Sequence, residues 1–459
     1  MSHSRDSING ITEGVIWKQL LIFFFPILLG TFFQQLYNTV DAVIVGNFVG
    51  KEALAAVGGA TGTLINLLVG FFMGLASGAT VIISQFYGAG RDEQVSQAVH
   101  TAIALSLVAT VIFFFVGFFG TPTALRWMDT PDDILPHATT YMRTYFCGIL
   151  FPLIYNIGSG VLRAVGDSRR PLYFLIICCM VNLVLDVVFV VVLKMGVFGV
   201  ALGTLISQAV SAILVVLTLI HIPNSCRLFF KEIRFTVPIL RSIILIGLPA
   251  GLQSVMYSLS NVIIQSSVNS FGTDVIAAWT AYGKIDGVYW MTINAFGLAI
   301  TTFVGQNFGA RKFDRVKKSV KVCMGMAFLA SVGISAVIML FGQYILKLFT
   351  SDPSVADIGM QVIRLLVPFY FTYVGIEVLS GTVRGAGDAF IPMVMTCLGV
   401  CVLRVAWIFI AVPLNRQIST VIVSYPITWI ITSILFIIYY LQGGWLRRRK
   451  AKMGFTDET

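Results

Sequence analysis

The sequence has little charge: Asp, Glu, Lys and Arg make up 11% of its 459 residues, whereas a soluble domain carries about a quarter. Hydrophobic residues make up 57%, and the mean hydropathy is +0.89. A soluble chain of this length would need far more polar side chains to cover its surface. This scarcity excludes a soluble enzyme, a nucleic-acid-binding protein and a disordered protein, and it predicts a polytopic membrane protein.

The sequence also lacks the groups on which most catalytic sites are built. It has four histidines, none in a metal-binding or catalytic-triad pattern, and it has no Walker A motif for ATP. Its seven cysteines show neither metal-ligand spacing nor a disulfide framework. We therefore expect no enzymatic activity and no cofactor apart from a transported ion.

Apolar stretches fill most of the chain. A membrane-spanning helix needs about 20 mostly apolar residues. Twelve stretches meet this requirement: 17–40, 53–83, 95–119, 139–163, 169–193, 197–222, 238–268, 275–305, 317–346, 359–383, 390–413 and 418–441. The expected fold class is an all-α polytopic membrane protein with twelve transmembrane helices.

The basic residues are distributed asymmetrically. If the N-terminus is cytoplasmic, 22 of the Lys and Arg residues fall on the cytoplasmic side, five on the opposite side and four within spans. The positive-inside rule then predicts that both termini are cytoplasmic. The net charge of +10 is thus attributed to topology and to contact with anionic membrane lipids, with no nucleic-acid partner. A bacterial inner (plasma) membrane fits this pattern.

The second half of the chain repeats the first at an offset of about 221–223 residues. The segment 160–167 matches 381–388 in its Gly, Arg and Gly-Asp positions, and Pro26 matches Pro249. Each repeat holds six spans, so both halves enter the membrane in the same orientation. We expect two pseudo-symmetric six-helix lobes: an N-lobe over 1–222, a cytoplasmic linker over 223–237 and a C-lobe with a basic tail over 238–459.

These motifs resemble a known transporter family. They comprise a proline in the first helix, Asp41 at its far end, a Gln-x-x-Gly-Ala loop at Gln85 and at Gln306, and an Arg-x-x-Gly-Asp turn at Arg163 and at Arg384. Together with twelve helices in two lobes, they are similar to the multidrug and toxic compound extrusion (MATE) family. The resemblance covers essentially the whole chain and implies the MATE fold and a drug-exporting activity.

Two acids inside the first lobe are candidates for ion coupling, because an ionisable residue within a span is costly and is a functional hypothesis by default. Asp41 shares a helical face with Gln34, Tyr37 and Asn38, and Asp186 lies four residues after Asn182. Asn156 and Thr204 could complete a polar cluster.

Two carboxylates in an apolar cavity resist double ionisation and titrate as a coupled unit, so they can carry a proton. With amide and hydroxyl oxygens they could instead hold Na⁺, at Asp41, Asp186, Asn182 and Thr204. The alternative is a purely structural hydrogen-bond network.

The resemblance sharpens this interpretation. Asp41, Asn182, Asp186 and Thr204 match the cluster implicated in cation coupling in the DinF-like branch of the family. The repeat places Leu403 and Trp407 at the positions of Asn182 and Asp186, so we assign coupling to the N-lobe alone.

The second lobe offers a different set of polar residues. Aromatic faces beside a carboxylate suit a lipophilic organic cation. The candidate substrate-binding residues are Gln34, Tyr37, Asn38, Gln253, Tyr257, Tyr282, Asp286, Tyr289 and Glu377. Alternatively, Lys284 pairs with Asp286 or Glu377, and Arg404 with a neighbour, as structural links.

Pro26 removes a backbone hydrogen bond inside the first span, so it is a candidate hinge. A fixed kink that only serves packing is the alternative interpretation.

The sequence thus predicts a monomeric secondary active antiporter. It would export small amphipathic cations in exchange for protons, with Na⁺ as the second choice of coupling ion. The alternative is a flippase for lipids or lipid-linked oligosaccharides from the same superfamily. Such a flippase is expected to have a more cationic cavity.

Overall fold

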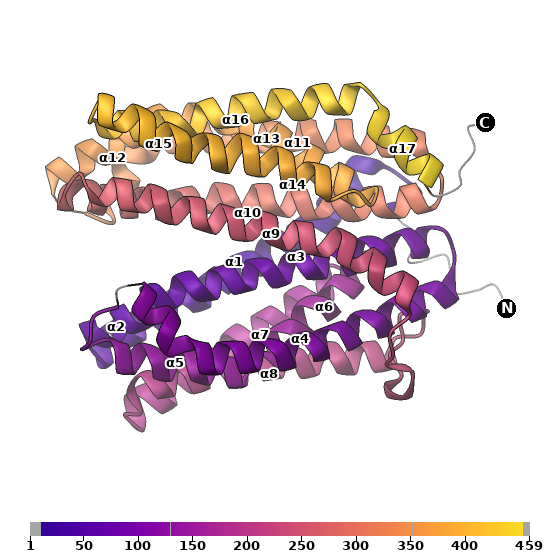
Figure 1. Ribbon diagram of the computed structural model, residues 1–459, viewed down its shortest axis with the longest axis horizontal. Helices are drawn as coiled ribbons and strands as arrows, with labels where there is room; N and C mark the ends of the chain where they lie inside the picture. The colour runs from indigo at the N-terminus through magenta and orange to yellow at the C-terminus, as the bar shows by residue number, and fades with distance from the viewer. Residues whose placement is uncertain (1–10, 129, 351, 453–459) are drawn as a thin grey trace. The chain divides into compact units, whose positions relative to one another are not determined.

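The computed structural model describes residues 11–128, 130–350 and 352–452, and within these ranges it contains helices and no strand (Figure 1). The helices of the first half are α1 (Ile16–Phe48), α2 (Lys51–Gly58), α3 (Ala60–Gly88), α4 (Asp92–Trp127), α5 (Leu135–Cys147), α6 (Leu150–Ala164), α7 (Arg169–Asp186), η2 (Val187–Val192), α8 (Gly196–His221) and η3 (Phe230–Glu232). Those of the second half are α9 (Val237–Asn269), α10 (Thr273–Gly309), α11 (Phe313–Lys347), α12 (Pro353–Leu366), η4 (Val367–Phe369), α13 (Tyr370–Gly385), α14 (Phe390–Thr396), η5 (Cys397–Val402), α15 (Leu403–Leu414), α16 (Ile418–Leu441) and α17 (Gly444–Lys452).

The helices reproduce the predicted spans. Among the described residues, eleven are long and apolar enough to cross a membrane, and α5 and α6, bent by 50° at their junction, count together as a twelfth. Each of the twelve predicted stretches falls on one of these, which confirms the predicted fold class. The two termini, which the charge pattern places in the cytoplasm, lie outside the described residues.

The helices gather into two compact units. Within the described residues, unit 1 comprises 25–251, and unit 2 comprises 11–24 together with 252–452. Helices α1 and α9 therefore each begin in one unit and continue in the other, and the changes fall next to Pro26 and Pro249. This division assigns 238–251 to unit 1, whereas the lobe boundaries at 222 and 237 stay a prediction of the sequence repeat.

The two units repeat the same helix packing. In unit 1, α3 packs against α4 and α6, and in unit 2, α10 packs against α11 and α13. A Cβ atom at Gly160 would collide with the Thr80 hydroxyl, and one at Gly381 would meet the Thr301 hydroxyl. Both Gly–Thr pairs are related by the offset of 221 residues. The glycines of the repeat motif thus permit the same close helix approach twice, as small residues do in membrane bundles.

The two Arg-x-x-Gly-Asp turns cap the helices that follow them. Gly166 and Gly387 have φ angles of 95° and 97°, which a side chain disfavours. One oxygen of Asp167 accepts the N–H groups of the first two residues of α7, at 3.1 Å each, and Asp388 accepts from Ile391 at 3.4 Å. The repeated motif is therefore a helix-start device.

The segment before α1 is fixed within unit 2. The Arg315 guanidinium donates to the main-chain oxygens of Ile11 (3.1 Å), Glu13 (2.7 Å) and Gly14 (2.9 Å). The Asn307 amide also donates to Ile11, at 3.3 Å. These bonds hold the chain at the point where it enters α1.

The predicted linker over 223–237 is fixed within unit 1. The main-chain N–H of Phe229 donates to His100 Nε2 of α4 at 3.0 Å, and that of Thr236 donates to Thr101 at 3.2 Å. Cys226 is fully buried. Burial, with a smaller contribution from Asp92, raises the pKa of the Cys226 thiol to about 12, so the thiol is neutral. The linker is thus packed onto α4.

Candidate functional site

The two predicted coupling acids are buried together in unit 1. Asp41 on α1 is 5% exposed and Asp186, the last residue of α7, is fully buried. Asn182, one turn before Asp186, is also fully buried, and Thr204 on α8 is 6% exposed. The structure therefore joins α1, α7 and α8 at the polar residues that the sequence singled out.

Contacts within this cluster centre on Asp41. The Thr204 hydroxyl donates to Asp41 Oδ2 at 3.4 Å. Asp186 and Asn182 lie close enough to act electrostatically on the same carboxyl group. The four predicted residues Asp41, Asp186, Asn182 and Thr204 thus form one cluster.

Most polar atoms of the cluster have no hydrogen-bond partner among the described residues. These atoms are Asp41 Oδ1, both carboxyl oxygens of Asp186 and both amide atoms of Asn182. Buried polar atoms without partners cost about 1–3 kcal/mol each, and charged groups cost more. A proton shared by the carboxyl groups, or a small cation among the oxygens, would satisfy them.

The local backbone brings Asp186 against α8. The chain turns from α-helical to π-helical directly after Asp186, in η2, a feature often found at functional sites. On α8, a Cβ atom at Gly203 would lie only 2.6 Å from Asp186 Oδ1. Gly203 therefore leaves room for the carboxyl group beside Thr204. The sequence pattern does not single out this residue, since a glycine in a span is more often a simple packing residue.

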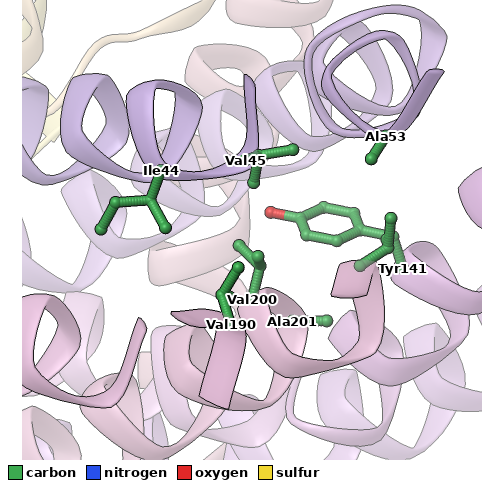
Figure 2. Close-up of a cluster of buried hydrophobic side chains, with 8 residues drawn as sticks. Ile44, Val45, Ala53, Tyr141, Val190, Val200 and Ala201 are labelled. Atoms are coloured by element: carbon green, nitrogen blue, oxygen red, sulfur yellow. The ribbon is translucent and has the colours of Figure 1, made fainter. Parts of the chain in front are cut away.

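Tyr141 on α5 is a second residue that the sequence analysis missed. It belongs to an apolar cluster with Ile44, Val45, Val190 and Val200. Figure 2 shows its hydroxyl end directed from α5 toward Val45 of α1 and Val200 of α8. The Tyr141 side chain interacts with Thr204 and with the carboxyl groups of Asp41 and Asp186. Its position near the start of the predicted span 139–163 gave no signal of this contact.

The other predicted N-lobe residues lie around this cluster to different degrees. Tyr37 is half-buried and interacts with Asp41. Gln34 is half-buried, whereas Asn38 is exposed and donates to Gln35 at 3.4 Å. The Asn156 amide donates to the Pro152 carbonyl of its own helix at 2.8 Å. A coupling role for Asn156 therefore stays a prediction.

The predicted carboxylate of the second half, Asp286, is held by an aromatic cluster in unit 2. Tyr282 donates to Asp286 Oδ1 at 3.1 Å, Tyr370 donates to the same oxygen, and the Trp290 indole donates to Oδ2 at 2.6 Å. Tyr289 donates to the Tyr370 carbonyl at 2.7 Å, and the two rings stack at 4.0 Å. Asp286 is thus an internal acceptor, half-buried at the edge of this cluster.

Several residues predicted to bind substrate are engaged inside unit 2. Tyr282 and Tyr289 are 3% and 0% exposed. The Tyr257 and Tyr373 hydroxyls lie 2.8 Å apart, and a Cβ atom at Gly297 would collide with Glu377. Gln253, Tyr257, Asp286 and Glu377 are half-buried. The sequence analysis missed Tyr370, which enters the cluster from a different helix.

The alternative interpretation, in which Lys284 pairs with Asp286 or Glu377, has no support in the described residues. In the described part of the chain, Lys284 is exposed and forms no ion pair with Asp286 or Glu377. Asp286 lies two residues further along α10 and so on another face of the helix. Arg404 does have neighbours: its guanidinium lies 3.9 Å from the centre of the Tyr425 ring and donates to Thr428 at 2.9 Å.

Pro26 lies inside α1, which continues through it, and Pro249 lies in the same way inside α9. Both allow bending, because each removes one backbone hydrogen bond. The hinge role of Pro26 stays a prediction. Among the residues that the structure describes, no three His, Cys, Asp or Glu side chains gather as a metal site. A cation here would therefore depend on two carboxyl groups with amide and hydroxyl oxygens.

Comparison with known proteins places the chain in a family. The MatE family model matches residues 26–188 and 249–410, one segment in each half of the sequence repeat. The probable multidrug resistance protein YpnP of Bacillus subtilis is 30% identical over 97% of this chain and 99% of its own length. The probable multidrug resistance protein NorM of Thermotoga maritima is 22% identical over 94% of each chain.

The fold has a counterpart among solved structures. A multidrug resistance MATE family transporter of the MOP superfamily, in an outward-facing conformation, matches with a TM-score of 0.89 at 23% identity. The match covers 97% of this chain and 98% of that one. With the helical fold, the twelve spans and the family match over both repeats, the chain belongs to the MatE family and is a multi-pass membrane transporter, not an enzyme.

Proposed function

We propose that this chain is a secondary active multidrug efflux antiporter that exports amphipathic cationic compounds in exchange for protons. Sodium is the second choice of coupling ion. The relatives named as multidrug resistance proteins support the export of drugs. The motif match of the coupling cluster supports a DinF-like branch and a site in the first half of the chain.

The carrying observation is the buried cluster at Asp41. Two carboxyl groups, an amide and a hydroxyl lie together in unit 1, and most of their polar atoms have no partner among the described residues. Two adjacent carboxylates cannot both stay ionised at low cost in an apolar setting. Binding of one cation to this cluster offsets the cost of the two charges, and release of the cation restores that cost. A coupled exchanger needs such a free-energy difference between its cation-bound and cation-free states.

The proposed transport cycle uses the free-energy difference between the cation-bound and the cation-free cluster. The outward-open protein binds the cation at Asp41 and Asp186, which favours release of the substrate. The inward-open protein releases the cation and takes up the next substrate. The proposed substrate contacts are exposed Asn38 and the half-buried residues Gln34, Tyr37, Gln253, Tyr257, Asp286 and Glu377. Buried Tyr282 and Tyr289 would act by holding Asp286 and Tyr370 in place.

The test uses purified protein in liposomes with a fluorescent lipophilic cation. A proton gradient and a sodium gradient are imposed separately on wild type, Asp41→Asn and the control Asp132→Asn, which changes an exposed acid between α4 and α5. We expect proton-driven transport that is lost in Asp41→Asn and kept in the control. Undiminished transport by Asp41→Asn would overturn the coupling site. Absence of transport under both gradients would favour the flippase alternative, to be tested with lipid-linked substrates.

The cellular setting belongs to the same proposal. The charge asymmetry supports a bacterial inner membrane with both termini in the cytoplasm. We expect a monomer, because one chain contains both halves of the repeat and the complete coupling cluster. Cysteine accessibility from each side of the membrane, probed at engineered terminal cysteines, tests the orientation.

A further inference from the structure

Lys284 is an exposed cation in the first third of the membrane-spanning helix α10. It follows the start of α10 by eleven residues, which at 1.5 Å per residue places it about 16 Å along the helix. The apolar core of a bilayer is about 30 Å thick. With 37 residues, α10 is longer than this core. A charged side chain within a membrane-spanning helix is costly unless water or a counter-ion meets it.

The exposed face of α10 has few of the large apolar side chains that contact lipid. In this helix, described throughout, Val288 is the single exposed large hydrophobic residue. The other exposed positions hold small or polar residues: Ala277, Thr280, Gly283, Lys284 and Asn294, besides the first two residues of the helix. By contrast, α11 exposes a series of bulky apolar side chains, among them Leu329 at 71% and Leu340 at 73%. The face around Lys284 is therefore suited to water and solutes.

The surroundings of Lys284 leave room for a ligand. A Cβ atom at Gly283 or at Gly287 would meet nothing within 4 Å. Gly287 lies one turn after Lys284 on the same helical face, and Gly283 directly precedes Lys284. Because neither glycine carries a side chain, a bound group can approach both the ammonium and the helix backbone.

The acids of unit 2 that could neutralise Lys284 are engaged elsewhere. Asp286 accepts hydrogen bonds from Tyr282, Tyr370 and Trp290 on another face of α10. Glu377 lies beside Gly297, thirteen residues or about 20 Å further along the helix from Lys284. Within the described residues of unit 2, no carboxylate pairs with this ammonium.

The repeated fold itself does not require a cation at this point. The offsets of 222 residues between Asn47 and Asn269 and of 221 between Gln85 and Gln306 place Gly62 or Thr63 at the repeat position of Lys284. Helix α3 forms with an uncharged residue there, and it packs against α4 and α6 as α10 packs against α11 and α13. Lys284 is thus an addition to one half of a duplicated architecture.

We infer that Lys284 is a specificity-determining residue that binds an acidic group, a carboxylate or a phosphate, of the exported amphiphile. This inference rests on the proposed export function and narrows its substrates to compounds that carry an acid in addition to a cationic group. A solute acid and a lipid headgroup share this chemistry, and the binding measurement with and without anionic lipid distinguishes the two sources. An ammonium pairs with such an anion as a compact charge with three donors.

The experiment compares two probes on one fluorescent lipophilic-cation scaffold, a free carboxylic acid and its methyl ester. Transport of each is measured in liposomes for wild type, Lys284→Arg, Lys284→Gln, Lys284→Glu and the control Lys317→Gln, which changes an exposed lysine of α11. We expect the acid-to-ester rate ratio to fall about tenfold in Lys284→Gln, as one lost charge contact predicts. The ratio should fall further in Lys284→Glu and stay close to wild type in Lys284→Arg and the control.

A binding measurement separates this inference from the export proposal. Tryptophan quenching by each probe is titrated in detergent and in nanodiscs with and without anionic lipid. Weaker binding of the acid by Lys284→Gln, even without transport by wild type, would support the Lys284 site while rejecting export. Equal acid-to-ester ratios in all variants, or an effect that disappears without anionic lipid, would overturn the inference.

Discussion

The hydroxyl of Thr204 on α8 donates to the carboxyl group of Asp41 on α1 at 3.4 Å, although 163 residues separate them. Asp41 Oδ1 and both carboxyl oxygens of Asp186 lack a partner within the described residues. The Thr204 hydroxyl is thus a donor to this carboxylate pair. Under the proposed function, this contact borders the place where the coupling cation would bind.

Replacement of Thr204 by valine removes that donor at nearly constant volume. A hydrogen bond to a charged group is worth about 1.5–3 kcal/mol, so we expect proton-driven efflux to fall about tenfold or more. Thr204→Ser keeps the hydroxyl and should retain most of the activity. The measurement is the initial rate of probe efflux under a fixed proton gradient. Equal rates for the valine and serine variants would show that the hydroxyl is unimportant.

Gly203→Ala should impair the Asp41–Asp186 cluster sterically. The added methyl group would lie 2.6 Å from Asp186 Oδ1 and must displace the carboxyl group. We expect coupled efflux to fall by about tenfold, since small displacements of a reacting group have effects of this size. Gly120→Ala on α4, where the added Cβ meets nothing within 4 Å, is the matched control. Wild-type efflux by Gly203→Ala would argue against a role for the Asp186 position.

Asp286→Asn should weaken the aromatic cluster of unit 2. The amide group would turn a donor toward Trp290 or toward the Tyr282 and Tyr370 hydroxyls, all of which donate to Asp286. Such a mismatch costs about 1–3 kcal/mol of folding free energy. A lower thermal unfolding midpoint in detergent is expected, whereas Asp314→Asn at an exposed site on α11 should leave it unchanged. An unchanged midpoint for both variants would leave Asp286 without its inferred structural role.

Arg315→Ala should release the segment before α1. Arg315 donates to three main-chain oxygens between Ile11 and Gly14 and, at 2.8 Å, to Gln19 Oε1. We expect faster hydrogen exchange in a peptide that covers 11–20, measured by mass spectrometry, because local opening becomes cheaper. Lys318→Ala, at an exposed neighbouring position, serves as the control. Equal exchange in the two variants would mean that other contacts hold this segment.

The sequence by itself determined the number of spans, the duplication and the identity of the buried acids. These features are local. A span in lipid must satisfy its own backbone hydrogen bonds by forming a helix, so a stretch of about 20 apolar residues predicts a transmembrane helix. The Gly-Asp turns are also local, since Asp167 caps the helix that begins two residues later. An acid within a span is conspicuous because lipid cannot solvate it.

Only the tertiary structure decided which polar groups meet. Tyr141 and Gly203 reach the Asp41 cluster from α5 and α8, and Tyr370 reaches Asp286 from α13. The spacing of residues along one helix does not predict such contacts, because they depend on how separate helices pack. Lys284 and Asp286 are two residues apart in the sequence, yet one is exposed and the other is hydrogen-bonded inside unit 2. The rotation of α10 about its own axis decides which of these two side chains is exposed, and the sequence pattern does not determine that rotation.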